Sequence, residues 1–400
     1  MVRDSFRCKS KFVSVQTLVL TYLLIFSIIN EAQATKENKW QKYLDAITKA
    51  TQEYTPCGGN CTCHADVITS DLQIWKDRGG IFKEDMDRGL ARAVHYQVIN
   101  HKLYRQDKCT FPARCSGVEH FILEILDDLP DMDIAINVHD WPQSVKHATH
   151  PLPILSFSKN REHWDVMYPA WTFWEGGPAV WPIYKTGLGR WDLMRKLLLK
   201  KDKEFPWEKK QNIGFFRGSR TSGERDPLVL LSRAKPSLVD AQYTKNQAWK
   251  SDKDTIGAEP AENVHLSEHC QYKYLFNFRG VAASFRLKHL FLCGSLVFHV
   301  GEDWLEFFYP ALTPWVHYLP VSTSLGEAED LIEFARENDE VVKKIAIRGK
   351  RFITKHLKME DVSCYWRKLL LQYAKLLKYK VERNSNYQQI FPTKQYRTEL

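Results

Sequence analysis

The stretch Phe215–Arg225 combines residue types that bind phosphate. It contains two glycines, three arginines and three hydroxyl side chains, and it follows a short apolar run. Glycine lets backbone N–H groups approach an anion, hydroxyls donate to phosphate oxygens, and guanidinium groups bind them in a bidentate fork. The stretch is interpreted as a strand that ends in a diphosphate-binding loop. A solvated basic turn between a strand and a helix would have the same composition.

A second candidate anion site is Gly280–Arg286, where small residues precede an arginine at the predicted start of a helix. Backbone donors and the helix dipole favour an anion at such a position. A surface ion pair is the alternative role for Arg286.

A nucleotide-sugar enzyme holds its diphosphate with a metal ion or with arginines. Asp131 and Asp133 match the D-x-D pattern of metal-dependent glycosyltransferases, but a proline precedes them, which indicates a polar turn.

Such a site also needs a base that accepts the proton of an attacking hydroxyl. Asp140 follows a predicted buried strand over 134–138, at the edge where open α/β sheets bind ligands. A carboxylate there could take the proton of a serine as its oxygen attacks an anomeric carbon. His139 and Glu175 are rival bases, and a purely turn-forming aspartate before Trp-Pro is the alternative role.

Alternating strands and helices must position these residues. The alternation predicts an α/β fold with two doubly wound domains facing a cleft, divided at a solvated linker over 200–204. An aromatic loop over 168–191 has no regular period and could stack on a sugar or contact a polypeptide, or be an irregular hinge. Strands are predicted at 134–138, 152–157, 212–216, 228–231, 238–241, 274–278, 295–300 and 315–321, and helices at 40–54, 118–129, 193–199, 281–292, 327–337, 340–356 and 362–377.

The two chain ends resemble targeting signals. Residues 1–34 have a basic start, a short apolar run and an Ala-x-Ala site, which is the layout of a cleaved signal peptide. The rival is a membrane anchor, but the run is shorter than the ~20 residues of a spanning helix. The final Arg-Thr-Glu-Leu departs from Lys-Asp-Glu-Leu at two positions. Together they predict a resident of the endoplasmic reticulum (ER) lumen without a membrane span, recognised by an ER-retrieval receptor.

The cysteines agree with that compartment. Eight of the nine lie beyond the signal peptide, and an even number in an oxidising compartment suggests four disulfides, whose pairing the count leaves open. Cys109 and Cys115 are close enough to close a loop. The Cys57–Cys63 cluster lacks the spacing of a zinc site. Asn60 is in the only N-glycosylation sequon.

The charge pattern argues against nucleic acid as a partner. Removal of the signal peptide takes four basic and two acidic residues, so the net charge falls from +9 to +7. No long basic tract is present, and the lysines are scattered among acidic residues. A small anionic molecule is the better expectation.

Four uncommon strings, at 116–121, 168–178, 216–222 and 278–286, resemble the protein O-glucosyltransferases of glycosyltransferase family 90, enzymes with a CAP10 domain and a KTEL motif. The resemblance extends over essentially the whole mature chain. It implies a GT-B fold of two Rossmann-like domains and inverting transfer of glucose from UDP-glucose. No metal cofactor is expected, because the arginines suffice to hold the diphosphate. The acceptor would be serine in Cys-x-Ser-x-Pro/Ala-Cys of folded EGF-like repeats, such as those of Notch. UDP-xylose stays open as a donor, because it lacks only one hydroxymethyl group.

The resemblance also implies roles for individual residues, with Asp140 as the base. The implied donor contacts are Ser219, Arg225, Val281, Ala282, Ala283, Ser284, Phe285 and Arg286, and the implied acceptor contacts are Thr110, Phe111, Pro112, Ala113, Arg114, Ala179, Val180, Trp181, Pro182, Ile183, Tyr184 and Lys185. The implied disulfides are Cys57–Cys63, Cys61–Cys364, Cys109–Cys115 and Cys270–Cys293. Arg217 and Arg220 are expected to be structural. Lys185 departs from the family, which often has proline at this position. The resemblance therefore does not determine the shape of the acceptor rim at that point.

The domains expected from this resemblance are an acceptor-binding domain with the base over 35–204 and a nucleotide-sugar domain over 205–365. A C-terminal helix and the retrieval tail would occupy 366–400. The alternative function is a non-catalytic ER lectin or folding factor for EGF-repeat proteins. Such a protein needs no donor site, so the combination of Asp140, Ser219 and Arg286 favours the enzyme.

Overall fold

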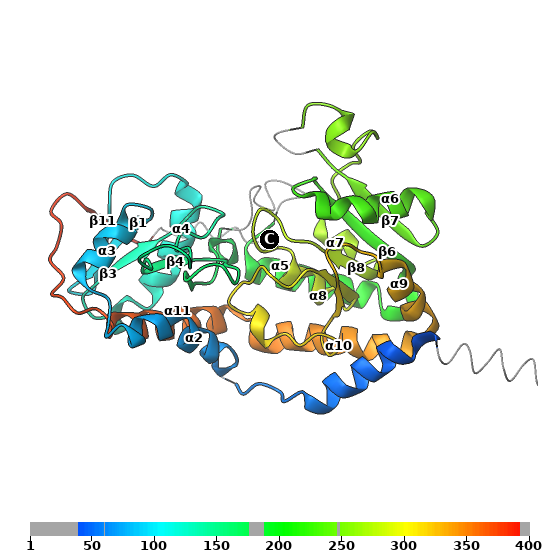
Figure 1. Cartoon of the computed structure of the whole chain (residues 1–400), viewed down its shortest axis with the longest axis horizontal. Coiled ribbons are helices and arrows are strands. Elements are labelled where there is room, and N and C mark those ends of the chain that lie inside the picture. Colours follow the sequence, from blue (N-terminus) through cyan, green and yellow to red (C-terminus); the bar gives the residue numbers. More distant parts are fainter. Residues whose placement is uncertain (1–38, 60, 176–187, 246–248, 393–400) are drawn as a thin grey trace, which may run out of the picture. The chain divides into compact units, whose positions relative to one another are not determined.

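The computed structural model describes residues 39–59, 61–175, 188–245 and 249–392. These residues belong to two compact units that divide after Glu53. The first is a helix over 39–53. The second, from Tyr54 on, contains two β-sheets with their helices (Figure 1). The predicted signal peptide at 1–34, the Asn60 sequon, the acceptor contacts at 179–185 and the C-terminal retrieval signal lie outside the described residues.

The first sheet is mixed, with the strand order β11-β2-β1-β3-β4-β5. Strands β3, β4 and β5 run parallel, whereas β1 is antiparallel to β2 and β3, and β11 is antiparallel to β2. The hairpin between β1 and β2 turns at Asn100 and His101, which both have positive φ angles of 49° and 56°. Such a turn matches the twist of the two strands. The strands are β1 (Val94–Ile99), β2 (Lys102–Arg105), β3 (Met132–Ile136), β4 (Ile154–Ser156), β5 (Val166–Met167) and β11 (Gln388–Ile390).

The second sheet is entirely parallel, with the order β10-β9-β8-β6-β7. Every residue of β9 is buried, as expected of a parallel strand with helices on both of its faces. The strand order is that of a doubly wound fold, and it reverses between β6 and β8. The strands are β6 (Gln211–Gly218), β7 (Val239–Tyr243), β8 (Tyr272–Asn277), β9 (Leu296–Val300) and β10 (Leu319–Val321).

Helices pack around both sheets. The α-helices are α2 (Ala65–Asp77), α3 (Lys83–Leu90), α4 (Pro112–Glu124), α5 (Trp191–Glu204), α6 (Asp226–Ala234), α7 (Leu266–His269), α8 (Leu287–Leu292), α9 (Ala328–Glu337), α10 (Asp339–His356) and α11 (Met359–Ala374). The 3-10 helices are η1 (Thr62–His64), η2 (Leu126–Asp128), η3 (Trp171–Phe173), η4 (Trp207–Lys209), η5 (Gly223–Arg225), η6 (Asp252–Thr255) and η7 (Tyr309–Ala311). None of the helices in the described part of the chain is both long and apolar enough to cross a bilayer.

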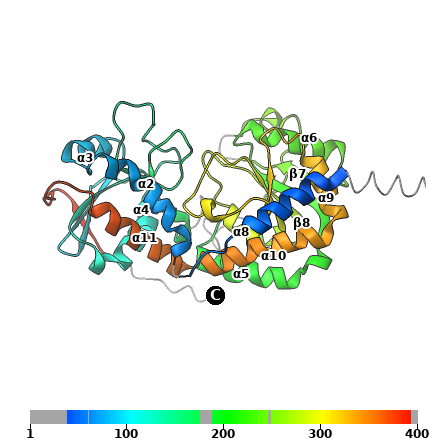
Figure 2. The same ribbon diagram turned by 60° about the horizontal axis from the view of Figure 1, so that its bottom comes forward.

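The chain returns to the first sheet at its C-terminal end. Helix α10 packs against α8 and β9 of the second sheet, whereas the next helix, α11, packs against α2 and α4 (Figure 2). Strand β11 then adds to the edge of the first sheet at β2. A disulfide between Cys61 and Cys364 fastens α11 to the residues just before η1. The first sheet and its helices are therefore built from both ends of this unit.

The α/β class with two sheets is confirmed, but some predicted elements are wrong. Residues 228–231 belong to α6, where Leu228 and Val229 are buried while Leu230 is exposed. That burial follows a helical period, and Pro227 is well placed in the first turn. Residues 200–204 form the last turns of α5 and are no linker, since lysine and glutamate are good helix formers. The strand predicted at 315–321 is reduced to β10, because Trp315 is in a turn with a φ of 64°.

Candidate active site

Two loops meet at the point where the order of the second sheet reverses. One follows β6 and contains Ser219 and η5, and the other follows β8 and contains residues 278–286. Because β6 and β8 are parallel neighbours, their carboxyl ends lie side by side at one edge of the sheet. Open α/β sheets bind their ligands at such a switch point. The two segments that the sequence proposed as anion sites are thus adjacent in the fold.

A cavity of about 700 Å³ opens at this edge. It is large enough for a nucleotide sugar, because small-molecule sites commonly measure ~300–1,000 Å³. All eight residues expected to contact the donor line it. Four residues of the first part of the chain, Arg114, Asp140, Phe157 and Leu188, line the same cavity. The proposed base and the proposed donor contacts therefore share one cavity.

Two arginines bring uncompensated positive charge to this cavity. Arg225 is 2% exposed, and its guanidinium donates to the carbonyls of Ser219 and Arg279. The guanidinium of Arg286 donates to the carbonyl of Arg217. Neither forms an ion pair with a carboxylate among the residues described by the structure. Burial lowers the pKa of Arg225 to about 9, with a further contribution from Arg286, and burial lowers the pKa of Arg286 to about 10. An anion in the cavity would relieve this repulsion.

The other arginines of these loops have carboxylate partners. The Nη2 atom of Arg217 donates to both carboxylate oxygens of Asp240, each at 2.8 Å. Arg220 pairs with Asp226, and the Nε atom of Arg279 lies 2.9 and 3.1 Å from the two carboxylate oxygens of Glu224. These pairs account for Arg217 and Arg220 as structural residues, although Arg217 also lines the cavity.

Gly218 lets β6 pass closely beneath Arg286. A Cβ atom built on Gly218 would clash with the Arg286 guanidinium. In the same loop, Gly223 has open space, since its nearest contact would be Asp226 Oδ2 at 3.9 Å. A side chain at this position would displace the Arg286 guanidinium, so the close approach of an arginine accounts for the glycine at the end of β6 without a backbone–phosphate contact.

The segment 281–286 is a turn and not the start of a helix, so that prediction is wrong. Helix α8 begins only at Leu287. The turn is fixed by neighbours instead: the Ala283 N–H donates to Ser158 Oγ over 3.2 Å, and Phe285 contacts Phe157. Ala282, Ala283 and Ser284 are buried, whereas Val281 is 49% exposed. Small residues at these positions let the turn pack against β4 and the segment after it.

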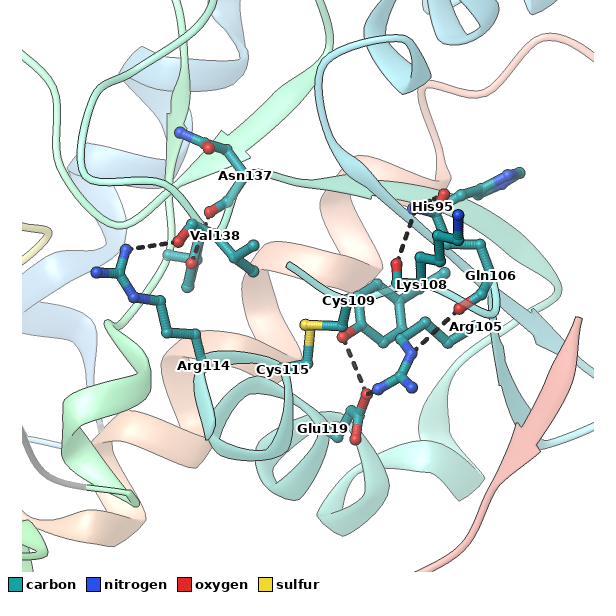
Figure 3. Close-up of a disulfide and its surroundings, with 12 residues drawn as sticks. His95, Arg105, Gln106, Lys108, Cys109, Arg114, Cys115, Glu119, Asn137 and Val138 are labelled. Carbon is teal, nitrogen blue, oxygen red and sulfur yellow. Dashed lines mark hydrogen bonds and ion pairs between the residues drawn. A yellow bond between two sulfur atoms is a disulfide. The ribbon is translucent and has the colours of Figure 1, made fainter. Parts of the chain in front are cut away.

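Asp140 is positioned by a turn that begins at the end of β3. The side-chain Oδ1 of Asn137 accepts the N–H of His139 over 2.9 Å, and its Nδ2 donates to the carbonyl of Trp141 over 2.7 Å. Arg114 approaches from the first turn of α4, where its Nη1 lies 3.1 Å from Asp140 Oδ1. The same nitrogen donates to the Val138 carbonyl over 2.7 Å (Figure 3). Asp140 keeps 37% of its side chain exposed and so remains accessible from the cavity.

The rival bases do not line this cavity. His139 is exposed and packs its ring edge against Phe111. Glu175 accepts the hydroxyl of Ser116. Of the three candidate bases, Asp140 alone lines the cavity that holds the unpaired arginines.

The D-x-D string has a structural role. Asp131 Oδ1 accepts the N–H of Asn100 over 2.7 Å and so holds the tight turn between β1 and β2. Asp133 is buried in β3, where its Oδ1 lies 2.8 Å from both His95 Nε2 and Gln97 Nε2. Neither aspartate lines the cavity.

The predicted acceptor segment Thr110–Arg114 lies where β2 leads into α4. Figure 3 shows the Cys109–Cys115 disulfide closing this segment, with Arg114 directed away from it toward Val138. Thr110, Phe111, Pro112 and Ala113 are exposed, and Arg114 is the only member that lines the cavity. The structure also contains the Cys57–Cys63 and Cys270–Cys293 disulfides.

Some lining residues were not singled out by the sequence. His269 lines the cavity beneath Arg286, and burial lowers its pKa to about 3, so the ring is neutral. Thr244 and Lys245 follow β7, and Asn263 lies in the loop before α7. Isolated residues in loops carry no periodic or motif signal, and only the folded chain brings them together.

Comparisons with known proteins identify the family. The family described as "Glycosyl transferase family 90" matches residues 57–398 of this chain. The chain belongs to glycosyl transferase family 90. Within this family, Protein O-glucosyltransferase 1 of Rattus norvegicus is 56% identical over 381 residues, covering 94% of this chain and 96% of the relative. O-glucosyltransferase rumi of Drosophila melanogaster is 51% identical over 357 residues, covering 87% of this chain and 86% of the relative. The α/β class that the sequence predicted is confirmed, and the second sheet is doubly wound as expected, whereas the first sheet is mixed and departs from the two doubly wound domains that were predicted.

Proposed function

We propose that this family 90 chain is an inverting protein O-glucosyltransferase that transfers glucose from UDP-glucose to serine. The observation that carries the proposal is the cavity whose lining includes Asp140, Arg225 and Arg286. A sugar transfer with a diphosphate leaving group requires a carboxylate and cations, and these two arginines have no carboxylate partner among the described residues. The names of relatives that are more than 50% identical support the same activity.

In this proposal Asp140 is the general base. Its carboxylate takes the proton of the serine hydroxyl as the serine oxygen attacks the anomeric carbon of glucose. The new bond forms on the face opposite the breaking bond to UDP, so the configuration inverts in one displacement. Arg114 holds the carboxylate from α4, and Asn137 holds the turn that carries it. No covalent enzyme intermediate is needed.

The departing UDP carries the bonding electron pair away as negative charge on its terminal phosphate. Arg225 and Arg286 are placed to compensate that charge, because no carboxylate among the described residues competes for them. We therefore propose that transfer needs no divalent cation. The cavity residues Ser219 and 281–286 would contact the rest of the donor.

The acceptor proposed is the serine of Cys-x-Ser-x-Pro/Ala-Cys in folded EGF-like repeats, such as those of Notch. The opening near Asp140 is bordered by the disulfide-braced segment Thr110–Arg114, which could contact such a repeat. UDP-xylose is an alternative donor, since an apolar pocket discriminates one hydroxymethyl group by only ~1–3 kcal/mol. The ER lumen is proposed as the compartment from the two terminal signals in the sequence.

The decisive experiment incubates the purified chain with a folded EGF repeat and either UDP-glucose or UDP-xylose, followed by mass spectrometry of the repeat. A hexose adduct on serine supports the proposal, and a pentose adduct assigns xylosyl transfer. The matched control is the same repeat with its serine changed to alanine. Binding of the repeat without any adduct would instead support the non-catalytic lectin or folding factor.

A further inference from the structure

A chain of three buried polar side chains lies behind the donor cavity. Asn277 is the last residue of β8 and His299 belongs to β9, and the strand register pairs these two residues directly. Side chains of paired residues in parallel strands project from the same face of a sheet. The Nδ2 atom of Asn277 lies 2.8 Å from Nδ1 of His299, and Ser284 Oγ donates to Asn277 Oδ1 over 2.7 Å. All three are buried, with exposures of 2% for Asn277 and 7% each for His299 and Ser284.

The histidine determines which way the amide faces. Burial lowers the pKa of His299 to about 4, so the ring is neutral, and Nδ1 can accept a hydrogen bond when Nε2 carries the proton. The amide nitrogen of Asn277 donates to this ring, and its oxygen is therefore directed toward the Ser284 hydroxyl. Buried polar groups are expensive to leave unpaired, so each member of the chain restricts the rotamer of the next.

Ser284 transmits this restriction to the donor site. Its Oγ accepts the backbone N–H of Arg286 over 3.3 Å, while its carbonyl accepts the Tyr309 hydroxyl over 2.9 Å. Ser284 and Arg286 both line the donor cavity, whereas Asn277 and His299 do not. His299 borders a separate cavity of about 150 Å³.

We propose that Asn277 and His299 are positioning residues for the nucleotide-sugar site. They fix the Ser284 hydroxyl, and through it the backbone at Arg286, in the conformation that receives the donor. Neither touches the donor itself. The inference rests on the proposed function, because it takes the cavity as the UDP-sugar site.

A double-mutant cycle on UDP affinity tests this role. Calorimetry would compare the intact protein with Asn277→Leu, Ser284→Ala and the double variant. If Asn277 acts through Ser284, each single variant weakens UDP binding by about tenfold, as expected for the loss of one net hydrogen bond. The double variant is then scarcely weaker than either single one, because the two residues form one unit.

A second variant guards against simple misfolding. The ring of His299 packs edge-on against Tyr309 and Tyr318, so His299→Phe keeps an aromatic ring there and removes both ring nitrogens, including the acceptor Nδ1. It should weaken UDP binding in the same direction, and this effect should also disappear in the Ser284→Ala background. The matched control is Ser232→Ala, which removes a buried hydroxyl bonded to Val239 and Ala241 away from the donor cavity. It should lower the melting temperature and leave UDP affinity unchanged.

The possible failures are distinguishable. Unchanged UDP affinity in folded Asn277→Leu and His299→Phe, or additive losses in the double variant, would overturn the positioning role while the proposed function stands. An intact protein that does not bind UDP would overturn both. The cycle measures binding of UDP alone, so it does not depend on an acceptor protein.

Discussion

Arg114 Nη1 lies 3.1 Å from Asp140 Oδ1 and 2.7 Å from the carbonyl oxygen of Val138. One nitrogen therefore joins the first turn of α4 to the turn that carries the proposed base. The guanidinium also packs 4.4 Å from the ring centres of both Phe111 and Trp171, which leaves it little freedom. The orientation of Asp140 thus depends on a neighbouring element that a disulfide braces.

Replacing the proposed base should separate chemistry from donor binding. Asp140→Asn keeps the shape of the side chain but cannot accept the serine proton, so we expect transfer to fall by on the order of 10²–10⁴-fold. UDP affinity should stay within about twofold by calorimetry, because the proposed base acts on the acceptor hydroxyl and is not one of the groups proposed to bind UDP. Normal turnover would move the base elsewhere in the site.

A companion variant tests the D-x-D string. Asp131→Asn alters only a carboxylate that accepts the N–H of Asn100 in the β1–β2 turn. We expect near-normal transfer in this variant, and also in the unmodified protein treated with a chelator. A strict requirement for a divalent ion, restored by adding it back, would contradict the proposal that arginines hold the diphosphate.

Removal of Arg114 should impair the base without affecting the donor. Arg114→Met keeps the apolar contacts of the long side chain and removes the contacts to Asp140 and Val138. Loss of this orientation should reduce kcat by roughly ten- to a hundredfold. UDP affinity measured by calorimetry should be unchanged. If the acceptor KM rises while kcat is preserved, then Arg114 contacts the acceptor and does not position the base.

The close approach at the end of β6 gives a prediction with a control in the same loop. Gly218→Ala places a Cβ against the Arg286 guanidinium, whereas Gly223→Ala meets open space. Displacing one charge-assisted contact should weaken UDP binding by on the order of tenfold or more in the first variant and leave it unchanged in the second. Equal effects of both substitutions would show that loop flexibility, and not the position of Arg286, controls donor affinity.

Loss of the guanidinium itself should be the more severe change. In Arg286→Met the charge is gone, and a hydrogen bond to a charged group is worth roughly 1.5–3 kcal/mol, so we expect UDP binding to weaken by about 10–100-fold. Arg220→Met is the matched control, since Arg220 already pairs with Asp226. The salt dependence of UDP binding should decrease only in Arg286→Met.

Buried neutral histidines should make stability depend on pH. Burial lowers the pKa of His64 to about 4, and that of His317 also to about 4. Because their unfolded pKa is ~6.5, the unfolded state binds more protons between about pH 4 and 6.5, and stability falls as the pH decreases through this window. Each such histidine accounts for roughly 3 kcal/mol at the acid end. Melting temperatures measured from pH 7.5 to 4.5 should decline steadily, with a shallower slope in His64→Phe.

Much of the second sheet could be predicted because its strands and helices have clear apolar periods. The runs that became β7, β8, β9, α9 and α10 are each close to their predicted places. The β6 loop was identified by composition alone, since arginine, glycine and hydroxyl residues are concentrated there. The sequence could not show which arginines of this loop lack a carboxylate partner, because the pairing depends on tertiary contacts. Asp240 and Asp226, which belong to other elements, neutralise Arg217 and Arg220.

The first sheet was harder to predict for physical reasons. Strand β1 contains His95 and Gln97, polar residues that are buried because Asp133 of the neighbouring strand and residues of the C-terminal segment, such as Tyr387, provide hydrogen-bond partners for them. A sequence pattern treats such residues as solvent-facing. The role of Arg114 toward Asp140 depends on the packing of α4 beside β3, and neither spacing nor composition specifies that contact. The roles of Asp140 and the donor contacts rest on the proposal above.

The return of the chain to its first sheet constrains how this protein can be made. A ribosome releases residues in order, so the parallel sheet from β6 to β10 can assemble while α11 and β11 are still being synthesised. The earlier sheet must wait, with the β2 edge unpaired and Cys61 lacking Cys364. A nascent chain that ends before Cys364 leaves Cys61 as a free thiol, and one that ends before β11 leaves the edge of β2 unpaired. A free thiol can form a wrong disulfide, and an open strand edge can pair with another chain. During synthesis the first sheet is thus exposed to wrong pairing until α11 and β11 have left the ribosome.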